Sequence, residues 1–203
     1  MKENVAAIIL AGGKGTRFGL KKQFLEINGK PLWKHVFDKI NRVIEKESIV
    51  VVGVDIEGGI TRSQSVINGL NFLNKKEENY ERLIILEAAR PLITLEQIKK
   101  IIEDEHDNCT YALPLTSTVV MRDGTYLDRN EMYKLSTPVA FNYRMFSDAY
   151  LSGKYFDYTD DSRVMYEHYG IKPYFLEGGE NMLKITYHSD LASLKILMEK
   201  YEL

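Results

Sequence analysis

Continuous apolar runs separated by segments of helical spacing are the main pattern along this chain. A run in which apolar residues do not alternate with polar ones predicts a strand that is covered on both faces, as in parallel α/β sheets. Such runs occupy residues 5–10, 48–54, 83–86 and 111–115. Between the first two runs, Pro31 opens a predicted helix whose apolar face carries Leu32, Val36, Ile40 and Val43. The order strand, helix, strand predicts a right-handed parallel crossover.

The second half of the chain predicts shorter elements. Thr94 and Gln97 have the spacing of a capping box, which predicts a helix that runs to about Asp104. Residues 116–133 form short alternating pieces and predict a β-hairpin arm that projects from the sheet and serves dimer contacts. Cap and strand signals predict the rest: a helix from Asn142 to before Gly153, a helix capped by residues 159–162 that ends before Gly170, short strands at 172–176 and 182–187, and a last helix from about Ser189.

Length and composition place the chain among ordinary globular proteins. Its 203 residues, 44% hydrophobic and 28% charged, predict a single domain over 1–203 without repeats or linkers. The formal net charge of -2 argues against general nucleic-acid binding. No apolar run reaches about 18 residues, so we expect no membrane span. The lone Cys109 predicts buried packing in a reducing compartment, and with no secretory leader we expect a cytoplasmic location.

A glycine-rich, cationic loop follows the first strand and is the strongest chemical signal. Its glycines would let backbone N–H groups approach a phosphate chain, and Arg17, Lys21 and Lys22 add positive charge. The P-loop pattern fails because Gly15, and not Ser or Thr, follows Lys14. The dinucleotide pattern also fits poorly, since its third glycine falls one residue late. A glycine turn with solvated lysines remains the alternative.

Three further segments combine polar residues with an expected position at the same sheet edge. Residues 57–70 carry glycines and hydroxyls into a helix start, which is typical either of a nucleoside contact or of a simple helix cap. Glu87 ends the third strand and is a candidate magnesium ligand beside a triphosphate, the alternative being an ion pair with Arg90. Residues 159–161 either contact a ligand or cap a helix.

Taken together, these motifs resemble the cytidylyltransferases that make CDP-methylerythritol and CDP-ribitol. The resemblance spans nearly the whole chain, with motifs in the same order. They are Ala11-Gly12-Gly13-Lys14-Gly15-Thr16-Arg17, Lys22-Gln23-Phe24-Leu25, the stretch from Arg62 to Leu70, Ala88-Ala89-Arg90-Pro91, Thr137-Pro138, Thr159-Asp160-Asp161 and Lys184-Ile185-Thr186. The resemblance implies an α/β, three-layer Rossmann-like nucleotidyltransferase fold, with a mostly parallel twisted sheet and a short projecting β-hairpin arm.

The resemblance also implies a role for each matching residue. The CTP phosphates would be wrapped by Ala11, Gly12, Gly13 and Gly15, and the cytosine would lie against Gly59 and Ser65. The transition state would be stabilised by Arg17, Lys22 and Lys184, and magnesium would be bound by Glu87 and Glu180. The acceptor phosphate would be held by Arg90, Thr137 and a dimer partner's Arg129, and the acceptor hydroxyls by Asp160.

The chemistry that the resemblance implies needs no nucleophilic side chain. A phosphate oxygen of the acceptor attacks the α-phosphorus of CTP in line, and pyrophosphate leaves. The enzyme works by positioning two anions and stabilising their charge, with Mg²⁺ as cofactor.

Three departures from the family pattern keep the acceptor open between ribitol phosphate and methylerythritol phosphate. Leu86-Glu87 stands where the family usually has His-Asp, Ile60 stands where the family is often polar, and the hairpin over 116–129 is short. Two other hypotheses remain at this point. One is a transferase that uses another nucleotide, and the other is a catalytically inactive CTP-binding homologue.

Overall fold

A six-stranded sheet forms the centre of the molecule in the computed structural model, which describes residues 4–13, 15–16 and 18–201. The strand order is β10 (Tyr174–Glu177), β6 (Asn108–Pro114), β9 (Tyr133–Asn142), β5 (Arg82–Glu87), β1 (Val5–Leu10) and β4 (Ile49–Val52). β1 is parallel to β4 and β5, and β10 is parallel to β6. β9 is antiparallel to both of its neighbours, β5 and β6.

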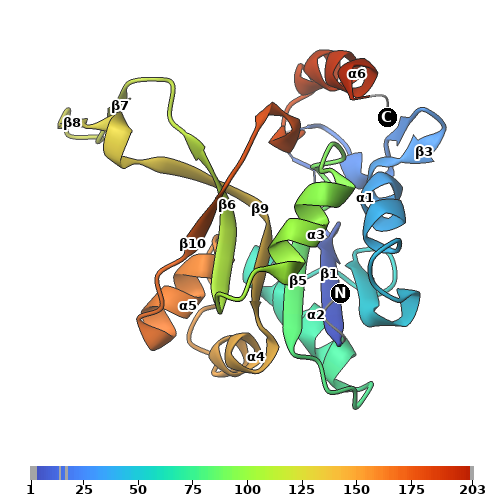
Figure 1. Ribbon diagram of the computed structural model, residues 1–203. Coiled ribbons are helices and arrows are strands. Elements are labelled where there is room, and N and C mark those ends of the chain that lie inside the picture. Colours follow the sequence, from blue (N-terminus) through green and yellow to red (C-terminus); the bar gives the residue numbers. More distant parts are fainter. Residues whose placement is uncertain (1–3, 14, 17, 202–203) are drawn as a thin grey trace.

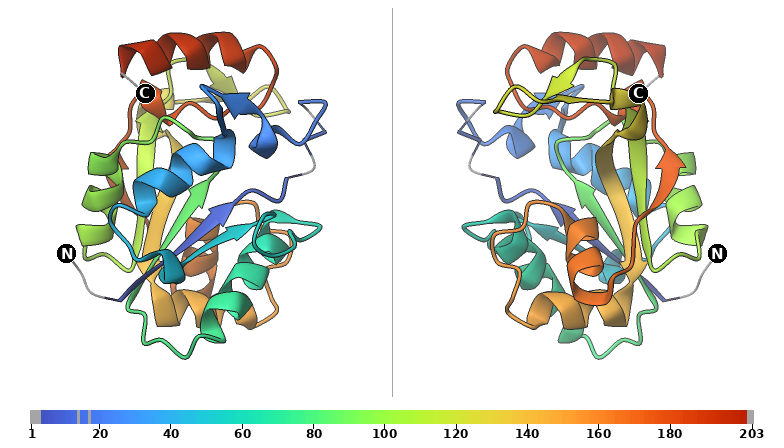
Figure 2. Two further views of the ribbon diagram at one scale, coloured as in Figure 1. Left: turned by 90° about the vertical axis from the view of Figure 1, so that its right-hand side faces the viewer. Right: turned by 90° about the vertical axis from the view of Figure 1, so that its left-hand side faces the viewer.

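Helices cover both faces of this sheet, which makes the fold three-layered (Figures 1 and 2). The helices α1 (Leu32–Ile40) and α3 (Leu95–Glu103) pack on one face, and α2 (Arg62–Asn74), α4 (Tyr143–Leu151) and α5 (Asp161–Tyr169) pack on the other. β1 shows why its sequence is a continuous apolar run. Ala7 and Ile9 point into the first core and Ala6 and Ile8 into the second, and all four are fully buried.

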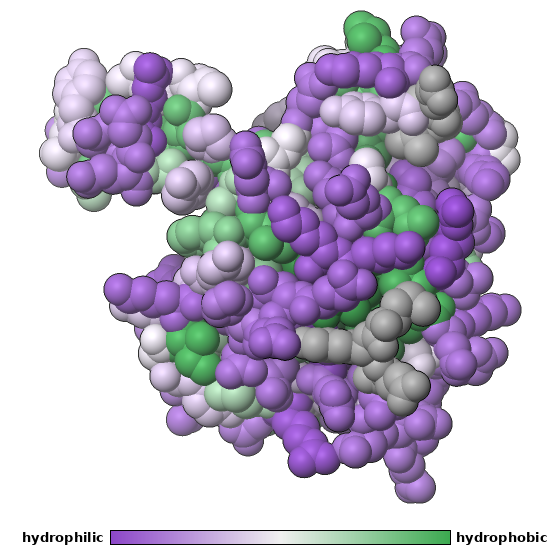
Figure 3. Space-filling view, in the orientation of Figure 1, coloured by the Kyte–Doolittle hydropathy of each residue, from purple (hydrophilic) through white to green (hydrophobic). Residues whose placement is uncertain are grey.

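The predicted hairpin arm is present and stands away from the body (Figures 1 and 3). It consists of β7 (Val119–Val120) and β8 (Tyr126–Leu127), which pair antiparallel, followed by the short 3-10 helix η3 (Arg129–Glu131). Because the arm carries the chain out from β6 and back into β9, these two long strands run antiparallel. Tyr126 at the arm is 77% exposed.

The C-terminal segment packs over the first loop through a third apolar cluster. Here α6 (Asp190–Lys200) contributes Leu194, which packs with Phe18 and Ile185. The Phe18 and His188 rings stack with centroids 5.3 Å apart. The strand predicted at 182–187 is wrong, because this stretch holds the end of the 3-10 helix η4 (Glu180–Met182) and irregular chain in which Ile185 N–H donates to the carbonyl of Ala89 at 2.8 Å.

Several predicted helix boundaries are confirmed by the capping contacts. Thr94 and Gln97 form the complete capping box of α3, and the Asn142 side chain accepts from Met145 N–H at the start of α4. Gly170 ends α5 with φ of 73°, the left-handed conformation that glycine adopts without strain. The remaining short elements are η1 (Lys22–Phe24), β2 (Glu26–Ile27), β3 (Lys30–Pro31) and η2 (Lys46–Ser48).

Cys109 lies in the core of β6 and is fully buried, as the sequence predicted. Burial, with a smaller contribution from the Asp104 carboxylate, raises the pKa of its thiol to about 12. A thiol in this environment is inert as a nucleophile. In the part of the chain that the structure describes, no helix has the length and apolar character needed to cross a bilayer.

Candidate active site

A cleft of about 410 Å³ opens where β1 and β5 end and α2 begins. In open parallel sheets this carboxyl edge is the usual place for ligands. Its described walls include Ala11, Gly12 and Gly13 from the first loop, Gly59 and Ser65 from the second, and Lys22, Glu87 and Lys184. Eight residues expected at a nucleotide site, which come from separate segments of the sequence, are thus brought together around one cavity.

The glycines of the first loop have different structural roles. A Cβ at Gly12 would lie 2.9 Å from the Cα of Gly58, so the first and second loops touch backbone to backbone. A Cβ at Gly13 would meet no described atom within 4 Å, so Gly13 presents its backbone to the cleft. Gly15 has φ of +68° and turns the loop. Arg17, the remaining expected cation of this loop, lies outside the described residues.

The second loop is both a helix cap and a wall of the cleft. Thr61 is the N-cap of α2, and its side chain accepts from Gln64 N–H. The Ser65 hydroxyl accepts from Gly59 N–H at 3.0 Å and donates to the carbonyl of Thr61 at 3.1 Å, which holds Gly59 at the rim. Ile60, at the same rim, is 84% exposed. The segment is therefore a helix cap, and this role does not exclude a contact with a nucleoside.

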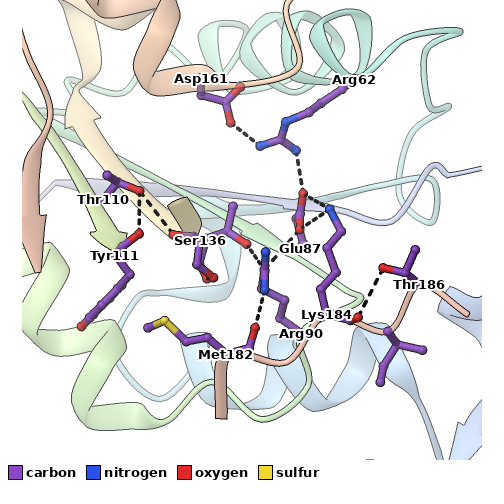
Figure 4. A network of polar contacts seen from close by, with 12 residues as sticks. Arg62, Glu87, Arg90, Thr110, Tyr111, Ser136, Asp161, Met182, Lys184 and Thr186 are labelled. Atoms are coloured by element: carbon purple, nitrogen blue, oxygen red, sulfur yellow. Dashed lines mark hydrogen bonds and ion pairs between the residues drawn. The ribbon is translucent and has the colours of Figure 1, made fainter. Parts of the chain in front are cut away.

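Glu87 is the centre of an ion-pair cluster at the floor of the cleft (Figure 4). Lys184 Nζ lies 2.9 Å from its Oε1 and 2.8 Å from its Oε2. Arg62 Nη1 lies 3.1 Å from Oε1, and Arg90 Nε lies 3.4 Å from Oε2. The expected pairing of Glu87 with Arg90 is thus only one of three cationic contacts.

The charges around Glu87 determine its ionisation. Its side chain is only 11% exposed, and burial alone would raise the pKa of this carboxyl group. The positive charges of Arg62, Lys184 and Arg90 outweigh burial and lower the pKa to about 2. The carboxylate is therefore ionised at neutral pH and holds three cations close together.

Lys22 connects two segments that line the cleft. It begins η1, and its Nζ donates to the carbonyl of Ile185 at 2.5 Å. Ile185 follows Lys184, so the two expected catalytic lysines are positioned by the same piece of chain. Both lysines line the cleft.

A second, smaller cavity of about 120 Å³ adjoins the first and shares Arg62, Glu87, Thr159 and Lys184 with it. It contains Arg90, Thr137 and Asp160, the three residues of this chain expected at the acceptor. Arg90 Nε donates to Thr137 Oγ1 at 3.0 Å, and its Nη1 donates to the carbonyl of Met182. These bonds fix the guanidinium plane within the cavity wall.

Asp160 borders this cavity from the start of α5. Its carboxylate accepts from Arg163 N–H at 2.9 Å and so caps the helix. Burial and the neighbouring Asp161 carboxylate raise the pKa of Asp160. Asp160 therefore caps a helix and lines the cavity, as the second loop does for α2.

Arg62 is a residue of the site for which no role was predicted from the sequence. It is the first residue of α2, and it contacts Glu87 through Nη1 and Asp161 through Nη2. It lines both cavities. Arg62 stands in a polar stretch at a predicted helix start, and this was the one signal of a functional role. A helix start by itself also explains an arginine at this position.

Two expected site residues lie elsewhere. Glu180 is on η4, has a side chain that is 52% exposed, and forms an ion pair with Lys200 of α6, outside both cavities. The structure therefore does not bring Glu180 to Glu87 as a second metal ligand. Arg129 is on the arm, where its Nη1 donates to the carbonyl of Thr116 at 2.5 Å, away from the cavities of its own chain.

The donor set fits Mg²⁺ only if the nucleotide supplies most of the ligands. Within the described ranges no group of three or more His, Cys, Asp or Glu side chains could hold a metal ion, and Glu87 is the acidic residue among those that line the larger cleft. Mg²⁺ commonly uses one or two carboxylates together with substrate phosphates and water. Three cations already surround Glu87, so the phosphates would have to offset their repulsion of the metal.

A glycine-rich loop at the end of the first strand and cations that converge beside it are features of nucleotidyltransferases. Comparison with known proteins agrees with this class. The model of one family, 2-C-methyl-D-erythritol 4-phosphate cytidylyltransferase (IspD), matches residues 5–200. The chain therefore belongs to this family, and it is a nucleotidyltransferase of the cytidylyltransferase type.

Individual relatives carry two different names. The chain is 31% identical over 222 residues to 2-C-methyl-D-erythritol 4-phosphate cytidylyltransferase of Thermotoga neapolitana, covering 97% of each chain. It is 27% identical over 233 residues to ribitol-5-phosphate cytidylyltransferase of Lacticaseibacillus paracasei, covering 98% of this chain and 100% of the relative.

Solved structures show the same fold. The bifunctional IspDF from Campylobacter jejuni matches with a TM-score of 0.81 at 28% identity, over 94% of this chain and 54% of that one, so this chain spans about half of that bifunctional protein. The synthase of 4-diphosphocytidyl-2C-methyl-D-erythritol from Anaerococcus prevotii matches with a TM-score of 0.79 at 22% identity, over 97% of this chain and 96% of that one.

Proposed function

We propose that this enzyme transfers CMP from CTP to a small phosphorylated polyol or sugar and releases pyrophosphate. Ribitol 5-phosphate and 2-C-methyl-D-erythritol 4-phosphate are the two candidate acceptors, because these are the substrates in the names of its relatives. One observation carries the proposal. Arg62, Arg90 and Lys184 converge on Glu87 where the two cavities meet, and this is where two phosphate groups would have to approach each other.

The larger cleft would hold CTP. The backbone of Gly12 and Gly13 faces the space for the phosphates, and Ala11 and Gly15 shape the same loop. Gly59 and Ser65 would border the cytosine, with the Ser65 hydroxyl already fixed by its two hydrogen bonds. Of the three proposed catalytic cations, Lys22 and Lys184 line this cleft, and Arg17 belongs to the same loop.

The smaller cavity would hold the acceptor. Its phosphate would bind Arg90 and Thr137, which a hydrogen bond already orients toward each other, and its hydroxyls would bind Asp160. An acceptor phosphate oxygen then forms a bond to the α-phosphorus of CTP as the bond to the pyrophosphate oxygen breaks. The chain contributes position and positive charge, and no side chain is covalently modified.

Mg²⁺ is the proposed cofactor. When bound, it would neutralise part of the charge of the phosphates. Glu87 would be its ligand from the protein, which requires Lys184 to turn from the carboxylate toward the phosphates. Glu87 would thus hold Lys184 before CTP arrives and release it to the phosphates.

A homodimer is also proposed. Val120, Met121 and Tyr126 expose apolar surface on the arm, at 49%, 51% and 77% (Figure 3). A partner's arm would cover such a surface and would bring Arg129 to the acceptor cavity. Sedimentation of the wild type and of Tyr126→Asp tests this proposal, with a dimer expected only for the wild type. The buried single cysteine supports a cytoplasmic location.

Two assays test the proposed function. In a thermal-shift series, CTP should raise the melting temperature more than ATP, GTP or UTP, because a ligand that binds the folded state stabilises it. In a turnover series, CTP, Mg²⁺ and each acceptor should release pyrophosphate for at least one acceptor. A larger shift with GTP or UTP would favour another nucleotide, and CTP binding without turnover across the panel would favour an inactive homologue.

A further inference from the structure

The first turn of α2 holds the segment that connects α4 to α5. Thr61 Oγ1 donates to the carbonyl of Phe156 at 3.0 Å, and Ser63 Oγ donates to the carbonyl of Tyr158 at 2.6 Å. Between them in sequence, Arg62 Nη2 donates to the Asp161 carboxylate. Three consecutive residues therefore bind three points of a segment that is about a hundred positions away along the chain.

The Arg62 contact is the ion pair among these three contacts. Its side chain is 21% exposed, and that of Asp161 is 1% exposed. The other oxygen of Asp161 accepts from the Tyr150 hydroxyl at 2.5 Å. Both carboxylate oxygens of Asp161 are thus used inside the protein, and the residue serves to anchor the start of α5.

The position of Asp160 depends on that anchor. Asp160 immediately precedes Asp161 and lines the smaller cavity together with Thr159. Its carboxylate also caps α5, so a shift of the first turn of this helix would move the carboxylate that faces the cavity. The contact of Arg62 with Asp161 thereby determines where Asp160 lies.

The other branch of the Arg62 guanidinium faces the nucleotide side. Its Nη1 contacts Glu87 at 3.1 Å, on the floor of the larger cleft (Figure 4). One planar group thus spans Glu87 of β5 and Asp161 of α5 and lines both cavities. A lysine has one ammonium group and cannot hold both carboxylates in this fixed geometry.

We propose that Arg62 is a positioning residue for the acceptor, which it serves by fixing the α4–α5 segment and with it Asp160. The identity of the acceptor rests on the proposed function, but the mechanical role of Arg62 does not. Direct binding of the CTP phosphates by Arg62 is the competing role, since Arg62 also lines the larger cleft. The positioning role predicts a raised KM for the acceptor, and direct phosphate binding predicts a raised KM for CTP.

Steady-state kinetics separate these roles. In Arg62→Lys and Arg62→Met, the KM for the acceptor should rise roughly tenfold to a hundredfold, because a small misplacement of a positioning group is costly. The KM for CTP should change by less than about threefold. Asp161→Asn should reproduce the acceptor effect. Combining it with Arg62→Met should raise the KM for the acceptor little further, since both changes break the same Arg62–Asp161 contact. A CTP effect equal to or larger than the acceptor effect would overturn the proposal.

Arg144→Met is the matched control. Arg144 is an exposed arginine of α4 whose Nη2 donates to Asn79 Oδ1 at 2.6 Å, and it lines neither cavity. Both KM values should stay at the wild-type level in this variant. If Arg62→Met fails to fold because it removes one cationic partner from each of two buried carboxylates, Arg62→Lys and Asp161→Asn provide the same comparison.

Hydrogen exchange tests the mechanical role without any substrate. Amides of residues 155–163 should exchange faster in Arg62→Lys and Asp161→Asn than in the wild type, while those of α3 should not change. Unchanged exchange in residues 155–163 would overturn the proposal. Failure of the wild type to turn over any acceptor would instead refute the proposed function, so the two failures are distinguishable.

Discussion

Lys184 Nζ lies within 2.9 Å of both carboxylate oxygens of Glu87, at the junction of the two cavities. This bidentate contact joins the end of β5 to the segment that precedes α6. It places a buried anion where the phosphates of a nucleotide and an acceptor would meet. The predictions below follow from this ion pair and from its neighbours.

Removal of the Glu87 charge should destabilise the ligand-free protein. In Glu87→Gln, Arg62, Arg90 and Lys184 would face one another without the anion that now holds them together. Breaking a buried ion pair in this way typically costs about 3–5 kcal/mol. Urea unfolding at neutral pH measures the loss. The exposed Glu103→Gln provides the control, and losses of similar size in both variants would contradict the role of the cluster.

The same carboxylate should make stability depend on acidic pH. The pKa of Glu87 is lowered from 4.5 to about 2 in the folded protein, so the unfolded chain binds the proton first as pH falls. The stabilisation is fully present above about pH 5 and is lost as the pH falls through about 2; the shift corresponds to on the order of 3 kcal/mol.

The difference between the wild type and Glu87→Gln isolates this contribution from that of other groups. Unfolding free energies of both proteins, measured at several values between pH 7 and pH 3, should converge as pH falls. A constant difference over that range would show that Glu87 does not carry the dependence.

Lys22→Ala should impair turnover more than CTP binding. Lys22 lines the larger cleft, and its ammonium group is held beside Lys184 by the carbonyl of Ile185. A cation that acts mainly on the transition state lowers kcat, by on the order of 10²- to 10³-fold for comparable single-donor losses. Titration with CTP and measurement of kcat separate the two effects. Lys195→Ala, at an exposed lysine of α6 that lines neither cavity, serves as control, and equal losses of binding and kcat in Lys22→Ala would count against this role.

Glu180→Gln should leave turnover close to the wild-type level. Glu180 is exposed, pairs with Lys200 and lines neither cavity, so the loss of its charge should not alter the site. Pyrophosphate release at several Mg²⁺ concentrations compares this variant with Glu87→Gln. A shift of the Mg²⁺ requirement in Glu180→Gln as large as that in Glu87→Gln would restore Glu180 as a metal ligand.

The sequence predicted the core of the fold because hydrophobic pattern and burial agree there. The runs that became β1, β4 and β5 are buried on both faces, and nothing else fits a continuous apolar segment of that length. β9 was not predicted as a strand. Its sequence contains Thr137-Pro138, and a proline normally argues against a central strand.

The position of a site residue was predictable from the sequence where the residue directly follows a strand. It was not predictable where tertiary contacts determine which way the side chain points. Glu87 and Gly12 end or follow buried strands, so their place at the sheet edge follows from the strand itself. Glu180 is close to Lys184 in sequence, but η4 directs it toward α6. The role of Arg62 depends on Asp161, a partner 99 residues away, and no local pattern reveals such a pair.

The most direct test of the central claim compares pyrophosphate release by the wild type and by Lys184→Met, with saturating CTP, Mg²⁺ and the acceptor that the panel identifies. The account predicts that the wild type turns over and that the variant is slower by on the order of 10²- to 10³-fold, while it still binds CTP. Equal rates in the two proteins would contradict the assignment of this ion-pair cluster as the catalytic centre.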